Sequence, residues 1–191
     1  MAIKLIVGLG NPGKDYQSHR HNVGFWFCDT VANLFAGNFK KESKFFGDVA
    51  QVNIAGLNVR LLKPNTYMNR SGQSIQSVAK FYQLNADEIL VVHDELDLNP
   101  GTARIKLAGG HGGHNGLRDT IKALDTKNFY RLRLGIGHPG DKSQVSDFVL
   151  HTPNKTELGQ IQDALISSLQ VIEDVVTGDI DKAMKHLHTQ T

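Results

Sequence analysis

Apolar residues recur along the chain with two spacings, which predict alternating strands and helices. Short apolar runs rich in β-branched residues are typical of buried strands. They occur at residues 3–9, 49–54, 59–62, 88–93, 102–107 and 132–136. Apolar positions three and four residues apart are typical of amphipathic helices. They occur at residues 22–35, 117–124 and 158–176, after Asn69, and in a short segment after Asp179.

This order predicts an α/β fold, a single globular domain over residues 1–191 with a central mixed, mostly parallel β-sheet flanked by helices. The strands at 49–54 and 59–62 are close enough in sequence to form an antiparallel hairpin. Ligand sites in such sheets collect at the carboxyl ends of strands. Polar residues follow three of the predicted strands, as Asn11, as the pair His93 and Asp94, and as a glycine-rich stretch. We therefore expect the functional site at that edge.

The composition is that of an ordinary soluble globular protein, with 40% hydrophobic and 21% charged residues in a chain of 191. No apolar run is long enough to span a membrane, and the first apolar run is too short for a signal peptide. We therefore expect a cytoplasmic protein without a membrane partner. The single cysteine, Cys28, excludes an internal disulfide and a zinc site made of several cysteines.

Charge is distributed unevenly along the sequence. Residues 104–142 contain eight Lys and Arg and three Asp, whereas residues 147–191 contain seven acidic residues and three lysines. A one-sided basic face follows from this pattern, and it fits either a polyanionic partner or a plain solvated surface.

Residues 109–116 read Gly-Gly-His-Gly-Gly-His-Asn-Gly, the most distinctive stretch of the chain. Glycine contributes no packing and loses the most backbone entropy on folding. Such a run is useful where the backbone must come close to a ligand or adopt positive φ repeatedly. Its imidazoles and amide suit polar substrate groups, so we interpret the stretch as a wall of the site.

Two further patterns suggest cofactors, but each has a stronger alternative. Residues 8–13 match G-x-G-x-x-G after a strand, yet the helix does not open at the third glycine and Pro12 lacks an N–H. A tight turn or a non-nucleotide site is the better interpretation. His93, His111 and His114 could bind zinc in a metal-dependent hydrolase, but no H-E-x-x-H helix occurs. We predict no metal and no cofactor.

His21 lies between a polar loop and a helix start, where an imidazole can remain exposed and titrate near neutrality. Asp94 ends a predicted buried strand and is a natural carboxylate partner. Together they would form a general-base pair that activates water. Asn69 precedes a predicted helix and fits either an N-cap or a site amide.

The combination of these segments in this order is far more specific than any one of them. The sequence resembles the bacterial peptidyl-tRNA hydrolase family from about residue 3 to about residue 150. The segments that carry the resemblance are 8–13, 20–24, 64–72, 93–97, 109–116 and 135–140.

The resemblance implies a monomeric enzyme that cleaves the ester between a peptide and the 3′ ribose of tRNA, without a metal, and so recycles tRNA. It implies that His21 is the catalytic base and Asp94 its orienting partner. It also implies that the substrate lies against Asn11, Tyr16, Met68, Asn69, His114 and Asn115, and that tRNA contacts Lys106, Arg133 and Lys142. The rival interpretations are a metal-dependent hydrolase, a tRNA-binding module without catalysis, and a nucleotide-dependent oxidoreductase.

Overall fold

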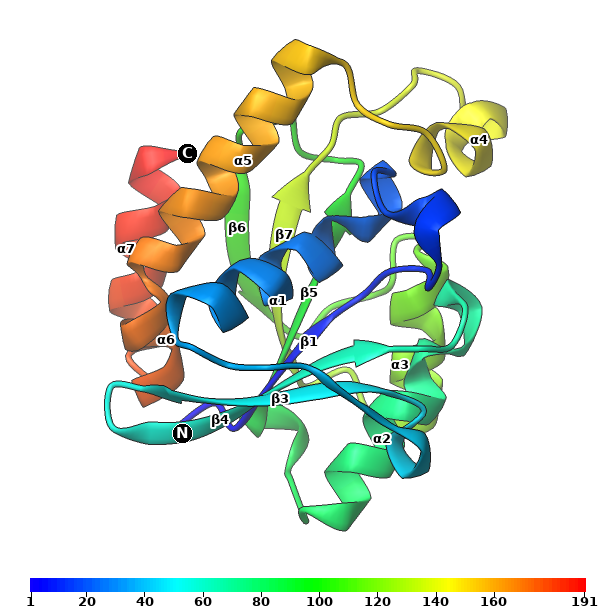
Figure 1. The fold of residues 1–191 in the computed structure, drawn as a ribbon. Coiled ribbons are helices and arrows are strands. Elements are labelled where there is room, and N and C mark those ends of the chain that lie inside the picture. Colours follow the sequence, from blue (N-terminus) through cyan, green and yellow to red (C-terminus); the bar gives the residue numbers. More distant parts are fainter.

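The computed structural model describes residues 1–191, which form a seven-stranded sheet with helices on both faces (Figure 1). The strands are β1 Leu5–Gly8, β2 Lys40–Glu42, β3 Gly47–Ile54, β4 Leu57–Pro64, β5 Ile89–Glu95, β6 Ala103–Leu107 and β7 Tyr130–Gly135. The α-helices are α1 Val23–Leu34, α2 Ser71–Phe81, α3 Asn115–Leu124, α4 Val145–Val149, α5 Lys155–Gln170, α6 Ile172–Thr177 and α7 Ile180–Gln190. Short 3₁₀ turns include η1 Lys14–Tyr16, η2 Arg20–Asn22, η4 Met68–Arg70 and η6 Lys142–Gln144.

The strand order is β2-β3-β4-β1-β5-β7-β6. The four central strands β4, β1, β5 and β7 run parallel, while β2, β3 and β6 join them through antiparallel pairings at the two edges. The predicted mixed α/β sheet flanked by helices is thus confirmed, with its parallel part confined to the centre.

The central strands are apolar on both faces because helices cover both. In β1, Ile6 packs into a core shared with α1, α5, α6 and α7, whereas Leu5 and Val7 pack into a second core with α2 and α3. Successive side chains of a strand point to opposite faces, so a run without polar interruption is what a doubly covered strand requires. No helix is both long and apolar enough to cross a membrane.

Two helix predictions were wrong in detail. The continuous helix expected at 158–176 breaks at Val171, which separates α5 from α6. The break lets α6 reach the segment that leads into β1, where the N–H of Ile3 donates to the carbonyl of Val176.

Asn69 does not cap α2. It lies in η4, and α2 begins at Ser71 without a side-chain cap from its own N-cap residue. The N–H of Gly72 instead donates to the carboxylate of Asp119 from α3, at 2.8 Å. A long-range partner has taken the place of the local cap.

The glycine-rich stretch reaches the site by a different route from the one expected. It follows β6, which is antiparallel to β7, so Leu107 at the end of β6 pairs with Tyr130 at the start of β7. The carboxyl end of β6 therefore lies at the opposite edge from the ends of β1 and β5. Residues 108–114 run back along the sheet before α3 begins at Asn115.

Candidate active site

The structure brings His21 and Asp94 together at the carboxyl end of β5. Nδ1 of His21, from η2, lies 2.8 Å from Oδ2 of Asp94. The side chain of Asp94 is 2% exposed and that of His21 is 12% exposed. His21 is thus more enclosed than the sequence suggested, because η2 folds down onto the end of β5 rather than standing in solvent.

His114 contacts the other oxygen of the same carboxylate, with Nε2 at 2.7 Å from Oδ1 of Asp94. Its Nδ1 accepts hydrogen bonds from the backbone N–H groups of Gly116 and Leu117, so His114 also caps α3. Nδ1 must therefore be the unprotonated nitrogen, and Nε2–H donates to Asp94. Asp94 is held between two imidazole N–H groups, which leaves Nε2 of His21 as a free acceptor.

These hydrogen bonds determine the charge states of Asp94 and His21. Burial alone would raise the pKa of Asp94, but His21 and His114 outweigh it and hold that pKa well below its ordinary value. Burial alone would lower the pKa of His21, but the Asp94 charge and hydrogen bond raise it above the ordinary 6.5. The carboxylate stays ionised, and the imidazole is a somewhat stronger base than a free histidine.

Asn11 is fixed by three hydrogen bonds just after β1. Its N–H donates to Oδ1 of Asn22 and its carbonyl accepts from Nδ2 of Asn22, both at 2.9 Å. Its own Oδ1 accepts from the N–H of Met68 at 2.8 Å. This contact orients the amide, so the Nδ2 hydrogens of Asn11 are left without a protein acceptor. Sequence reasoning missed Asn22, although it stands beside His21 in the segment already singled out.

The remaining predicted substrate residues lie in η1, in η4 and at the start of α3. Met68 is buried, and its sulfur lies 2.5 Å from where a Cβ on Gly116 would be, so a side chain at position 116 would displace Met68 from its place against the start of α3. Asn69 and Asn115 are exposed, and Oδ1 of Asn115 accepts from Arg118. The ring of Tyr16 meets the ring of Tyr67 edge-on, with centroids 6.1 Å apart.

The predicted tRNA contacts divide between two places. Lys106 and Arg133 lie on adjacent strands and on the same sheet face, opposite the face that carries Ile105 and Leu132. Lys106 is exposed without an ion-pair partner, whereas Nε of Arg133 donates to Glu95 at 2.9 Å. Lys142 lies apart from these strands, exposed in η6.

The histidines of the metal hypothesis do not form a cluster. His111 is outside the site and its Nδ1 accepts from the N–H of Gly113. Nδ1 of His93 contacts the carbonyl of Asp94, and burial lowers the pKa of His93 to about 3, so it stays neutral.

A different set, His21, Asp94 and His114, has ligand atoms within 4.8 Å of one another. A metal bound to Nε2 of His114 would require the proton to move to Nδ1, which would break the two hydrogen bonds that cap α3. The geometry therefore favours a proton-transfer network at this set of residues.

The glycines of residues 8–13 make room for a helix. A Cβ on Gly8 would lie 2.2 Å from the carbonyl oxygen of Gly24 in α1, and one on Gly10 would overlap the ring of Phe25. Close packing of α1 on β1 thus accounts for both glycines, in keeping with the interpretation that this is not a dinucleotide motif.

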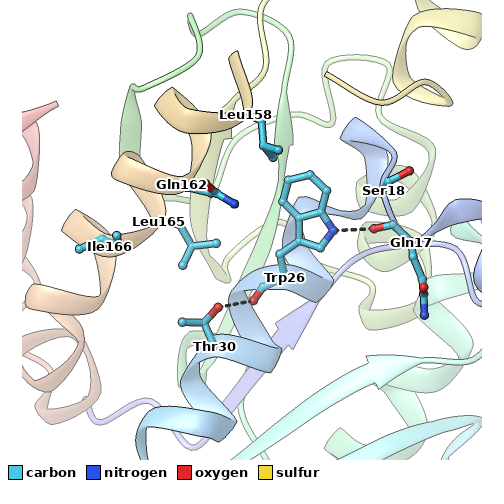
Figure 2. A pocket seen from close by; sticks show the side chains of 8 residues that line it. All are labelled: Gln17, Ser18, Trp26, Thr30, Leu158, Gln162, Leu165 and Ile166. Carbon is cyan, nitrogen blue, oxygen red and sulfur yellow. Dashed lines mark hydrogen bonds between the residues drawn. The ribbon is translucent and has the colours of Figure 1, made fainter. Parts of the chain in front are cut away.

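A separate cavity of about 460 Å³ lies between α1 and α5 (Figure 2). Trp26 forms one wall, and its Nε1 donates to the carbonyl of Gln17 at 2.7 Å. The cavity is lined by Gln17, Ser18, Trp26, Thr30, Leu158, Gln162, Leu165 and Ile166. None of these side chains is an acid or a base.

Several known proteins are similar to this chain over nearly its whole length. A family model described as peptidyl-tRNA hydrolase matches residues 5–191. The chain is 70% identical over 190 residues to the peptidyl-tRNA hydrolase of Ruthia magnifica subsp. Calyptogena magnifica, with all of both chains covered. It is 52% identical over 188 residues to that of Neisseria meningitidis serogroup A, with 98% of both covered.

A crystal structure of the peptidyl-tRNA hydrolase from Acinetobacter baumannii matches with a TM-score of 0.97 and 48% identity, over 99% of this chain and 96% of that one. Sequence and structure agree over nearly the whole length, and this chain belongs to the peptidyl-tRNA hydrolase family.

Proposed function

We propose that the protein hydrolyses the ester between a peptide and the 3′ ribose of tRNA, with His21 as general base. The observation that carries this proposal is the contact of Nδ1 of His21 with Asp94, which leaves Nε2 free to take a proton. A base of this kind contributes roughly 10²–10⁴-fold to rate. The resemblance that names this substrate also covers the segments that form the site.

Water is the only co-reactant in the proposed hydrolysis. Nε2 of His21 takes a proton from water while the water oxygen bonds to the ester carbonyl carbon. The carbonyl becomes an oxyanion, and we assign as its donor the Nδ2 group of Asn11, which has no protein acceptor. The ester C–O bond then breaks, and the imidazolium of His21 returns its proton to the ribose oxygen. Asp94 stabilises that imidazolium throughout.

The surrounding side chains would hold the two parts of the substrate. We assign Tyr16, Met68, Asn69 and Asn115 to the peptide and the ribose. His114 would act through Asp94, because its Nε2–H is committed to that carboxylate. We also propose that the enzyme acts as a monomer in the cytoplasm, where peptidyl-tRNA arises.

The activity is tested by release of N-acetyl amino acid from N-acetyl-aminoacyl-tRNA in the presence of EDTA. Unacetylated aminoacyl-tRNA serves as the comparison substrate. Release from the blocked substrate alone would support the proposal. Protein that binds tRNA without releasing product would favour a binding module, and activity restored only by zinc would favour a metal hydrolase.

Activity should fall on the acid side with a midpoint above pH 6.5. Only neutral His21 can accept a proton, and Asp94 raises its pKa above that ordinary value. Below the midpoint, kcat/KM should drop about tenfold for each pH unit, because that is the rate at which the neutral fraction declines. A profile of kcat/KM between pH 5 and 8 measures this. An acid limb below pH 6 would mean that Asp94 does not act on His21 as described.

Substituting Lys106 or Arg133 with alanine should raise KM for the full tRNA substrate and flatten its salt dependence. Each phosphate contact removed should lower the slope of log affinity against log salt by about 0.7–0.9. The check is KM at several salt concentrations, with Lys122→Ala on the exposed side of α3 as the control. An unchanged slope would remove these residues from the tRNA interface.

A further inference from the structure

Arg20 is a buried arginine that stands directly before His21 in η2. Its side chain is 9% exposed. Its Nη1 donates to the carbonyl of Phe148 at 3.1 Å and to that of His151 at 3.3 Å, and its Nη2 donates to Oε2 of Glu157 at 3.1 Å. The guanidinium also packs over the ring of Phe148, 3.9 Å from the ring centroid. One side chain thus joins η2 to the end of α4 and to the first turn of α5.

The acceptors of Arg20 are themselves held in place. The carbonyl of His151 also accepts from the backbone N–H of Arg20 at 3.0 Å. Oε1 of Glu157 accepts from Nδ2 of Asn154 at 3.0 Å, and the N–H of Glu157 donates to Oδ1 of Asn154 at 2.8 Å. A planar guanidinium can reach three fixed acceptors at once, whereas a lysine ammonium on a flexible stem is a poor replacement.

The segment that contains α4 depends strongly on these contacts. Every hydrogen bond between residues 141–152 and the rest of the chain involves either Ser18 or Arg20. α4 has only five residues, of which Val149 alone is buried, and it stands out from the sheet beside the turns that precede α1 (Figure 1). A segment that buries so little of its own surface opens easily unless another part of the chain holds it.

His21 is placed by the same turn. η2 is a three-residue 3₁₀ turn without a side-chain cap, so it has little stability of its own. Asn22 fixes its far end through two hydrogen bonds with the backbone of Asn11, and Arg20 fixes its near end. The 2.8 Å contact of His21 with Asp94 therefore depends on the long-range contacts of the two neighbours of His21 in the sequence.

We propose that Arg20 is a positioning residue that holds His21 against Asp94 by fastening η2 to α4 and to Glu157 of α5. This inference rests on the proposed function, because it names a residue on which the general base depends. Arg20 acts through His21 and not on the substrate, since both of its Nη groups already have protein acceptors. Without these contacts, η2 would keep His21 hydrogen-bonded to Asp94 for only part of the time.

Arg20→Lys keeps the charge but removes the planar guanidinium. It should lower kcat by about 10²-fold, the size of loss that follows from misplacing a catalytic group by about 1 Å, with little change in KM. The loss should be the same on N-acetyl-aminoacyl-tRNA and on the N-acetyl-aminoacyl ester of adenosine. Arg60→Lys is the matched control and should change neither rate. Arg60 also packs over an aromatic ring, that of Tyr82 at 3.5 Å, but it pairs with the first residue of β1, far from the site.

The pH profile of kcat/KM separates positioning from a general loss of stability. His21 faces the Asp94 carboxylate and the ring of His114, and the contact with Asp94 raises its pKa above 6.5. A looser contact should move the acid limb of Arg20→Lys down toward pH 6.5. A protein that is merely less stable would have fewer active molecules but the same midpoint. The Tm of each variant is measured so that all assays are made on folded protein.

Glu157→Gln tests the same link from α5 without altering η2. It should lower kcat less than Arg20→Lys does and move the acid limb in the same direction. The double variant should be no slower than Arg20→Lys alone, because both changes act on one contact. Unchanged kcat in Arg20→Lys, or a lower kcat with an unmoved acid limb, would overturn the inference. If the unmodified protein hydrolyses neither substrate, the proposed function itself fails.

Discussion

Replacing His21 with alanine should slow hydrolysis of N-acetyl-aminoacyl-tRNA by about 10²–10⁴-fold while the chain remains folded. The neighbouring imidazoles cannot replace it, because Nδ1 of His114 accepts from Gly116 and Leu117 and burial lowers the pKa of His93 to about 3. Asp94 keeps its hydrogen bond from His114, so the end of β5 retains its structure. Single-turnover rates measure the loss, and near-UV circular dichroism checks the fold.

The loss should be equal on the N-acetyl-aminoacyl ester of adenosine, a substrate without phosphates, since His21 acts at the ester and not on the tRNA phosphates. His186→Ala is the control, as His186 is exposed on α7 and distant from this chemistry in the sequence. Turnover within a few-fold of the unmodified enzyme in His21→Ala would remove His21 as the base. The proton acceptor would then have to be sought elsewhere.

Asp94→Asn should reduce kcat by up to about 10⁴-fold, the effect seen when an asparagine replaces the orienting aspartate of a serine protease. An asparagine side chain offers one acceptor oxygen and one NH₂ group. His114 must present Nε2–H, because its Nδ1 caps α3, and so it would take the oxygen. The NH₂ group would then face Nδ1 of His21 and place the proton of that imidazole on Nε2. The base would be held in the wrong tautomer.

The matching control is Asp163→Asn, an exposed aspartate on α5. The double variant His21→Ala with Asp94→Asn should be little slower than His21→Ala alone, because Asp94 acts through His21. Additive losses would show instead that Asp94 has an independent role, such as binding the substrate. Measuring kcat for the four proteins of this cycle decides between the two.

The local pattern was sufficient for most of the secondary structure. The strand expected at 88–93 is β5 and the helix expected at 22–35 is α1, each within two residues at either end. The edge strand β2 was missed because its residues Lys40–Glu42 are all charged and carry no apolar signal. The errors at Val171 and Asn69 both arose where a tertiary contact replaced the local preference.

The sequence by itself determined the α/β class, because apolar periodicity reflects which side chains are buried. The order of the motifs indicated the family and, through it, the chemistry. It placed His21, Asp94 and the asparagines in one hypothesis, but it left their orientations open. Only the tertiary structure decided that His114 shares the Asp94 carboxylate and that Oδ1 of Asn11 accepts from Met68, which leaves Nδ2 without a protein acceptor.

The structure also separated Arg131 from the other basic residues. In the sequence Arg131 is one of eight basic residues between positions 104 and 142. The fold buries it beneath the glycine-rich loop. The groups that hydrogen-bond to Arg131 are distant from it in sequence and meet it only when the sheet has formed. No local sequence pattern could therefore reveal its burial or its partners.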